Sequence, residues 1–206
     1  MGGKGNFKYR SATNTSPTEF QEGLVGDTNS YMFELRLIAD IGLVGMPNAG
    51  KSSLLNELTS AKSKVANYAF TTLEPNLGAY YELIIADIPG LIEGASEGKG
   101  LGVKFLKHIE RTGALFHLVN AESDDVVRDY KLIREELQTY SKALGKKNEY
   151  AFLSHSDAVS AEELAEKLKQ LKKAGVKALP LSIIDSDSLD SVRDILNTIK
   201  AKRESR

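Results

Sequence analysis

The stretch Gly45-Met46-Pro47-Asn48-Ala49-Gly50-Lys51-Ser52 fulfils the pattern G-x-x-x-x-G-K-S of a phosphate-binding loop, or P-loop. It follows the apolar run at residues 41–44 and precedes a segment of helical periodicity at residues 51–59. The motif therefore lies where a buried strand passes into a helix, which is the context that a phosphate loop requires.

The residue types at these positions suit the binding of a triphosphate. Gly45 and Gly50 allow the backbone to approach phosphate oxygens closely, and the helix N-terminus presents partial positive charge to them. Lys51 can reach the β- and γ-phosphates, and the hydroxyl of Ser52 can ligate Mg²⁺. We predict that all eight residues of the loop contact nucleotide and that Lys51 is catalytic.

Periodicity outward from the loop predicts an α/β domain. Apolar runs indicate strands at residues 41–44, 78–83, 83–88, 114–119, 150–153 and 176–181. Helical patterns occupy residues 51–59, 100–112, 124–144, 160–173 and 188–202, with Ser188 as the expected N-cap of the last helix. This alternation predicts a three-layer P-loop NTPase fold, with a mostly parallel six-stranded sheet and helices on both faces.

Composition limits the remaining possibilities. The chain of 206 residues suffices for one full α/β domain, which we place at residues 33–206, plus a short appendage at residues 1–32. The appendage is rich in glycine and polar residues and has too few apolar groups to form its own core. A net charge of −1 excludes a global basic field, and the lack of cysteine excludes thiolate metal sites and disulfides. No apolar run approaches the ~20 residues of a membrane span.

A second motif, Asp87-Ile88-Pro89-Gly90, follows the apolar run at residues 83–86. A carboxylate at the C-terminal end of a strand in such a sheet lies where nucleotide binds. We predict that Asp87 is a partner of Mg²⁺ and that Gly90 offers its N–H to the γ-phosphate.

Two threonines lie between these motifs, in Phe70-Thr71-Thr72-Leu73-Glu74. A GTPase needs one threonine here, whose hydroxyl closes onto Mg²⁺ only when the γ-phosphate is present. Four glycines between residues 94 and 102 then predict a segment that rearranges easily. This interval is typical of a nucleotide-dependent switch, and we predict that Thr72 and Gly90 are catalytic together with Lys51.

These motifs lie within longer strings that resemble the Obg family of GTPases. The resemblance covers roughly residues 33–206, and its strings are residues 37–45, the Met-Pro-Asn-Ala-Gly-Lys-Ser loop, and residues 70–78, 86–95 and 105–112. Residues 2–6 and 13–17 are similar to the end of the glycine-rich N-terminal domain of that family. The resemblance implies that residues 1–32 are a remnant of that domain or a linker.

The resemblance also implies ligands and partners. It implies that Ser52 and Thr72 ligate Mg²⁺, and that GTP contacts the loop and residues 70–74 and 87–90. Asn48 is similar to the loop asparagine of potassium-stimulated GTPases, which implies a K⁺ beside the phosphates. The resemblance implies a protein of the cytoplasm, or of an organelle descended from bacteria, that binds GTP or GDP and, at full length, acts in assembly of the large ribosomal subunit with its RNA. We expect a monomeric, cytoplasmic protein. Leu91 stands where Ras-like enzymes have a water-orienting glutamine, so we expect slow intrinsic hydrolysis.

The base-reading motif departs from the Asn-Lys-x-Asp pattern of such proteins and reads Ser154-His155-Ser156-Asp157. The carboxylate of Asp157 can accept from guanine N1–H and N2–H, which adenine does not offer. His155 either lies flat over the base or is an exposed loop imidazole. The expected Ser-Ala contact appears as Ser182-Ile183-Ile184. We therefore predict guanine binding that is weaker or looser than that of relatives with intact motifs.

Two other functions stay open at this point. The altered base motif and Leu91 are compatible with a degenerate scaffold that holds nucleotide without turnover, and an adenine-nucleotide enzyme is the third alternative. Outside the base motif, His117 lies in an apolar strand run, where we expect a core residue with one backbone partner.

Overall fold

A computed structural model describes residues 1–30, 39–59, 64–65, 76–87 and 112–204 of the chain. The chain divides into two compact units, Met1–Leu35 and Arg36–Arg206. The first contains a short 3₁₀ helix, η1 (Asn6–Tyr9). Two backbone hydrogen bonds join residues 1–4 to residues 21–24: Gln21 N–H donates to the carbonyl of Lys4, and Leu24 N–H to that of Met1. Among residues 1–30 only Pro17 is buried, so this segment has no apolar core.

The described residues of the second unit form a seven-stranded sheet in the order β2-β3-β4-β1-β5-β6-β7. The strands are β1 (Ile41–Val44), β2 (Lys64–Val65), β3 (Asn76–Tyr80), β4 (Leu83–Asp87), β5 (Ala114–Asn120), β6 (Asn148–Ser154) and β7 (Ala178–Pro180). Strands β4, β1, β5, β6 and β7 are parallel, whereas β2 and β3 form an antiparallel edge. The predicted α/β class is confirmed, but the expected six strands become seven because the two-residue β2 extends that edge.

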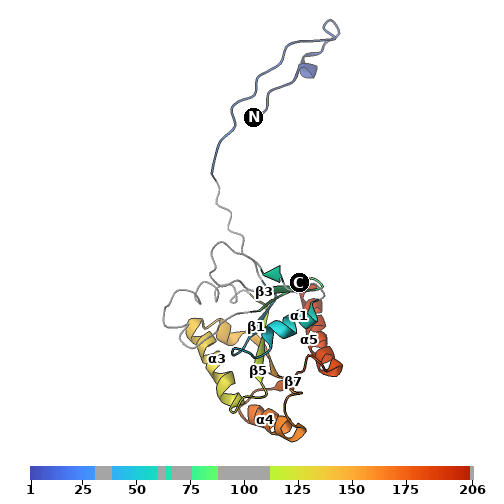
Figure 1. The fold of residues 1–206 in the computed structure, drawn as a ribbon. Helices are drawn as coiled ribbons and strands as arrows, with labels where there is room; N and C mark the ends of the chain where they lie inside the picture. The colour runs from blue at the N-terminus through green and yellow to red at the C-terminus, as the bar shows by residue number, and fades with distance from the viewer. Residues whose placement is uncertain (31–38, 60–63, 66–75, 88–111, 205–206) are drawn as a thin grey trace. The chain divides into compact units, whose positions relative to one another are not determined.

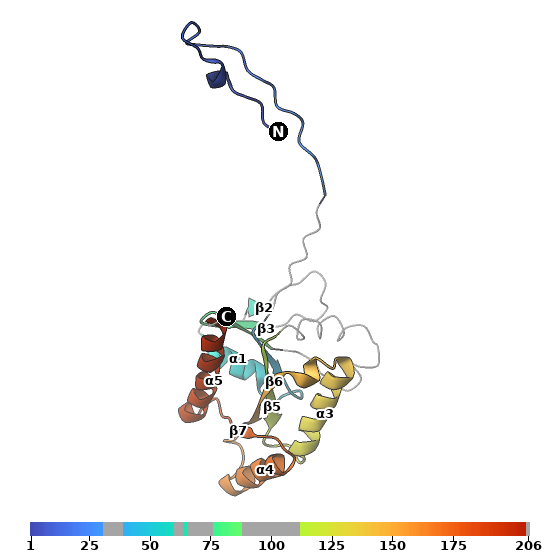
Figure 2. The same ribbon diagram turned by 180° about the vertical axis from the view of Figure 1, so that it is seen from behind.

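Helices cover both faces of the sheet, as Figures 1 and 2 show. On one face, α1 (Lys51–Leu58) and α5 (Ser186–Glu204) pack on β1, β4 and β5 through a buried cluster that includes Leu54, Phe116 and Leu196. On the other face lie α3 (Val126–Tyr140) and α4 (Ala161–Lys173), with η3 (Leu144–Lys146) beside α3. The predicted three layers are therefore present.

Several predicted helix boundaries differ from the structure by one to four residues, and two of the differences have a clear local cause. The helix expected at residues 124–144 ends at Tyr140, because Ser141 adopts an extended conformation with φ −154° and ψ 129°. The last helix begins two residues before Ser188, which is not its N-cap: the buried Ser188 hydroxyl donates to the carbonyl of Ser182 and accepts from the Ser182 N–H. Residues 100–111 of the helix expected at residues 100–112 lie outside the described residues.

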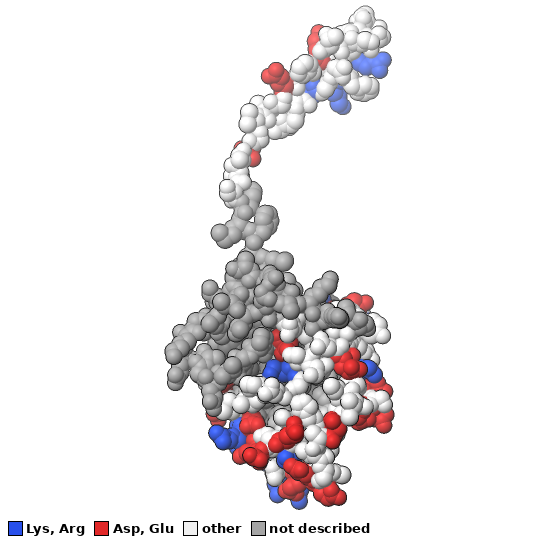
Figure 3. Space-filling model, in the orientation of Figure 1, with Lys and Arg blue, Asp and Glu red and all other residues white. Residues whose placement is uncertain are grey.

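The surface carries charges of both signs. On the face seen in Figure 3, acidic and basic side chains are interspersed over the described residues, and acidic ones gather over its lower part. This pattern agrees with the net charge of −1. In the part of the chain that the structure describes, no helix combines the length and apolar character needed to cross a bilayer.

A buried polar network lies between the sheet and α3. His117, on β5, is fully buried, and its Nδ1 lies 2.7 Å from Oε1 of Glu149 on β6. Arg134 of α3 pairs with the other carboxylate oxygen at 2.8 Å, and the ring of Tyr130 stacks on His117 with centroids 4.6 Å apart. The expected backbone partner of His117 is therefore wrong, because a carboxylate from the adjacent strand takes that place.

The network predicts a pH-dependent stability. Burial acts to raise the pKa of Glu149, but the hydrogen bond and charge of His117, with smaller effects from Arg134 and Tyr130, outweigh it and lower that pKa. Burial and then the negative charge of Glu149 raise the pKa of Tyr130 to about 12, with the positive charge of Arg134 opposing them. A carboxyl group with a lowered folded-state pKa stabilises the fold above its unfolded-state pKa, and that stability is lost as the pH falls through the folded-state value.

We expect Glu149→Ala to lower the free energy of unfolding by about 3 kcal/mol at pH 7, because it leaves His117 and Arg134 without their buried partner. Urea unfolding measured at pH 7 and at pH 3 checks this, and the difference between the variant and the parent should shrink at the lower pH. Glu135→Gln, an exposed change on the same helix as Arg134, is the control. A difference that is equal at both pH values would contradict the assigned role of the carboxylate charge.

Candidate nucleotide-binding site

The phosphate loop begins directly after β1 and ends at the start of α1. Gly45 has φ +150°, and a Cβ there would lie 2.3 Å from the carbonyl oxygen of Leu118 on β5. Gly50, the residue before α1, has the left-handed φ of +81°. Both glycines are therefore required by the backbone itself, in addition to any close approach of phosphate. Pro47 and Asn48 form the exposed tip between them.

Lys51 is held against the loop that precedes it. Its side chain is buried, and its Nζ donates to the carbonyl oxygens of Gly45 at 3.0 Å and Met46 at 2.9 Å. Burial lowers the pKa of Lys51, and the negative charge of Asp87 partly opposes this effect. The ammonium group is thus oriented by the loop and lacks full solvation, so an anion in the loop would compensate its charge.

Ser52 and Asp87 meet at the carboxyl ends of two neighbouring strands. Asp87 is the last residue of β4 and pairs in register with Leu43 of β1, which brings it beside the start of α1. The Ser52 hydroxyl donates to Oδ2 of Asp87. The other oxygen, Oδ1, is buried and has no hydrogen-bond partner among the described residues. A hydroxyl and a carboxylate with a free buried oxygen fit a hard cation such as Mg²⁺, which takes oxygen ligands.

Ser154 supports the phosphate loop from the sheet. It is the buried last residue of β6, and its Oγ lies 2.9 Å from the carbonyl oxygen of Ala49 and 3.0 Å from that of Val119. A hydroxyl has one hydrogen to donate, and both neighbours are acceptors. Ser154 therefore lies between the end of β6 and the loop, and its one donor is engaged by two backbone carbonyls, one on the loop and one on β5.

His155 lies over the phosphate loop. Its backbone has the left-handed φ of +54°, which is strained for a residue other than glycine. A Cβ built on Gly50 would lie 3.2 Å from Nε2 of His155 and 3.5 Å from its Cε1. The residue is partly buried, and its ring lies beside Gly50 of the loop, so it is not a fully exposed loop imidazole; its stacking over the base stays a prediction.

Asp157 and Ser182 bring the two predicted base-reading segments together. The side chain of Asp157 is exposed and hydrogen-bonds with Ser182, and this bond is the main reason why the pKa of Asp157 is lowered. The two segments are also joined by the backbone, because Ser156 N–H donates to the carbonyl of Leu181. Ile183 and Ile184 follow with exposed side chains. A charged acceptor thus stands at the rim of the site.

Part of the predicted site lies outside the described residues, namely Phe70, Thr71, Thr72, Leu73, Glu74, Ile88, Pro89 and Gly90. One polar residue that the sequence did not single out joins the described part: Asn120, the last residue of β5, whose Oδ1 lies 3.1 Å from Nδ1 of His155. The only signal for it was an amide side chain at the end of an apolar strand.

Lys51 is wrapped by the loop between β1 and α1, and Asp87 ends the adjacent parallel strand β4. These two features define the class of P-loop nucleotide-binding domains. Residues 40–155 match the family model described as 50S ribosome-binding GTPase, and the chain belongs to this family.

Within the family, the chain is similar to proteins named GTPase Obg, which confirms the resemblance found in the sequence. It is 48% identical over 195 residues to GTPase Obg 2 of Anaplasma marginale, covering 93% of this chain and 59% of the relative. It is 46% identical over 205 residues to GTPase Obg of Rickettsia bellii, covering 97% and 62%. The chain thus spans less than two thirds of the length of these relatives.

Solved structures share the fold at low sequence identity. The G domain of the FeoB iron transporter of T. maritima has a TM-score of 0.56 at 19% identity, covering 80% of this chain and 99% of that one. A GDP-bound point mutant of S. thermophilus NFeoB has a TM-score of 0.56 at 22% identity, covering 76% and 61%. Both comparisons support the fold alone.

Proposed function

We propose that this chain is the nucleotide domain of a GTP-binding switch of the Obg type that hydrolyses GTP slowly and depends on Mg²⁺. The observation that carries the proposal is the contact of Ser52 with Asp87 beside the loop-bound Lys51. Family membership and relatives named GTPase Obg favour GTP as the substrate.

Each group at the phosphate end has a role in this proposal. Lys51 neutralises charge on the β- and γ-phosphates, and Gly90 and Thr72, both predicted from the sequence, contact the γ-phosphate and the cation. Ser52, Thr72 and Asp87 would hold Mg²⁺, and Asn48 would hold a K⁺. When bound, the cation withdraws charge from the phosphate oxygens. The other loop residues, except Pro47, which has no backbone N–H, would bind phosphate through their backbone N–H groups.

The residues that would contact the base favour guanine, with weaker discrimination against other bases than an intact Asn-Lys-x-Asp motif would give. Asp157 offers two oxygens to guanine N1–H and N2–H, and Ser156, Ser182, Ile183 and Ile184 line the same rim. The one donor of Ser154 is engaged by the carbonyls of Ala49 and Val119, so this residue adds less to the base than an asparagine amide would. His155 covers the loop beside the nucleoside.

The wider setting is proposed from the family. We place the end of the glycine-rich N-terminal domain, or a linker from it, at residues 1–32 and the G domain at residues 33–206. The full-length protein would be a cytoplasmic monomer that binds the large ribosomal subunit and its RNA. The family description, 50S ribosome-binding GTPase, supports the ribosomal partner, and relatives named GTPase Obg support a G domain.

Single-turnover hydrolysis tests the function. The chain is mixed in excess with γ-labelled GTP and Mg²⁺, in K⁺ and in Na⁺, and we expect phosphate release slower than about one per second, faster in K⁺. Leu91 is the reason for the low rate, since an aliphatic side chain does not orient water. Nucleotide that stays bound and intact for hours in both salts would instead establish the second candidate, a non-hydrolysing scaffold, which Leu91 and Ser154 favour.

A further inference from the structure

Asn120 lies at a junction of the sheet and the nucleotide site. It is the last residue of β5 and pairs in register with Ser154, the residue before His155. Ala121 N–H donates to the carbonyl of Ser154 at 2.8 Å, so the ends of β5 and β6 are held together at this point. Asn120 is half-buried and belongs to neither the phosphate loop nor the base-reading segments.

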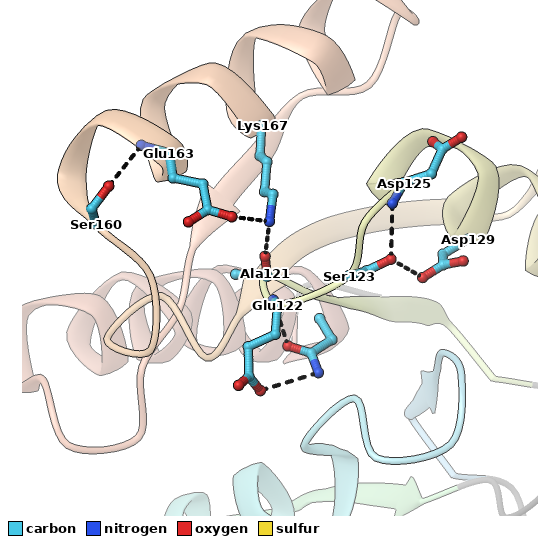
Figure 4. A network of polar contacts seen from close by, with 9 residues as sticks. Ala121, Glu122, Ser123, Asp125, Asp129, Ser160, Glu163 and Lys167 are labelled. Atoms are coloured by element: carbon cyan, nitrogen blue, oxygen red, sulfur yellow. Dashed lines mark hydrogen bonds and ion pairs between the residues drawn. The ribbon is translucent and has the colours of Figure 1, made fainter.

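The turn that follows Asn120 is anchored on two helices, as Figure 4 shows. Lys167 of α4 donates to the carbonyl of Ala121 at 2.6 Å and pairs with Glu163 at 2.5 Å. On the other side, the Ser123 hydroxyl donates to Asp129 of α3 at 2.6 Å. The backbone of the turn is therefore a fixed support for the side chain of Asn120.

This support determines which amide atom of Asn120 faces His155. The backbone N–H of Glu122 donates to Oδ1 of Asn120 at 3.0 Å, and a backbone N–H is always a donor. The Nδ2 group contacts a carboxylate oxygen of Glu122 at 3.5 Å, which agrees with this orientation. The atom that lies 3.1 Å from Nδ1 of His155 is thus an acceptor.

An acceptor at this distance requires a hydrogen on Nδ1 of His155. In a neutral imidazole only one nitrogen carries hydrogen, so Nε2 then has a free lone pair. Nε2 is also the ring atom nearest to a Cβ built on Gly50, at 3.2 Å. The side of the ring that faces the phosphate loop is consequently an acceptor, whereas a lysine at this position would present only donors.

We infer that Asn120 is a positioning residue for nucleotide binding, which fixes His155 as the Nδ1–H tautomer and holds its Nε2 edge over Gly50. Asn120 itself does not touch the nucleotide in this inference. It acts through His155, whose strained backbone alone does not determine the orientation of the ring. The effect on affinity depends on the proposed nucleotide binding, but the tautomer does not.

Long-range ¹⁵N–¹H spectra of the imidazoles test the tautomer in the nucleotide-free chain, with the His155 signal assigned by its loss in His155→Ala. We expect a protonated Nδ1 and a bare Nε2 at a pH where the ring is neutral. Asn120→Ala should shift the population towards Nε2–H, and Asn120→Asp, which keeps an acceptor, should restore Nδ1–H. Glu122→Ala is the matched control, because it keeps the backbone N–H that orients Asn120. A bare Nδ1 in the parent, or a tautomer unchanged in Asn120→Ala, would overturn the inference.

A double-mutant cycle tests the consequence for binding. Asn120→Ala should weaken GDP binding about fivefold in the parent, the value of one hydrogen bond, but less than about twofold in His155→Ala. Equal losses in both backgrounds would mean that Asn120 acts only on the fold and would overturn the positioning role. A parent chain that shows the expected tautomer but binds no GDP would contradict the proposed function alone.

Discussion

Lys51→Met should weaken the binding of GDP by about two orders of magnitude while leaving the fold intact. The ammonium is held by the carbonyls of Gly45 and Met46, so it is already directed into the loop before nucleotide arrives. Charge-assisted hydrogen bonds contribute about 1.5–3 kcal/mol each, and loss of a single group that contacts phosphate therefore corresponds to about a hundredfold in affinity. Equilibrium titration with a fluorescent GDP analogue measures this loss.

The same variant should change stability little. Burial lowers the pKa of Lys51, so the charged form is disfavoured in the free protein, and methionine removes that cost together with the two hydrogen bonds. We expect the free energy of unfolding without nucleotide to stay within about 1 kcal/mol of the parent. Lys142→Met, at an exposed position, is the control for loss of one positive charge. Unchanged GDP affinity in a folded Lys51→Met protein would remove Lys51 from the site.

The parts of the fold that sequence predicted are those with strong local signals. The order of strands and helices follows from apolar periodicity, and the position of the phosphate loop follows from two glycines whose φ angles are positive in the structure. The two-residue β2 was missed because so short a strand has no periodicity. The end of α3 at Tyr140 was missed because apolar residues continue to Leu144, which packs in the core from η3.

The parts that sequence could not predict depend on contacts between distant segments. Glu149 becomes the partner of His117 only because β5 and β6 pair in the register His117↔Ala151, which places Glu149 two residues before the residue opposite His117 and so on the same face of the sheet. The engagement of Ser154 with the loop carbonyl of Ala49 depends likewise on the three-dimensional arrangement of β6 and the loop. A pattern of residue types along the chain contains no information on either geometry.

Asp157→Asn is expected to weaken GDP binding by about a hundredfold and to favour XDP over GDP. The Asp157 carboxylate is exposed at the rim, and its lowered pKa, which arises mainly from its hydrogen bond with Ser182, keeps it charged near neutral pH. It can accept from N1–H and N2–H of guanine together, and an asparagine amide replaces one of these acceptors by a donor. Xanthine has a carbonyl oxygen in place of the guanine amino group, so the amide matches it better.

Competition titrations with GDP, XDP and ADP on the parent and Asp157→Asn measure the change of preference. Asp185→Asn removes an exposed carboxylate from the neighbouring loop and serves as the control, with all three affinities expected to match the parent. If the parent bound ADP as tightly as GDP, Asp157 would not be reading guanine. Because Ser154 is engaged with the phosphate loop, Asp157 has little help from that neighbour, and this one carboxylate should determine most of the discrimination between guanine and adenine.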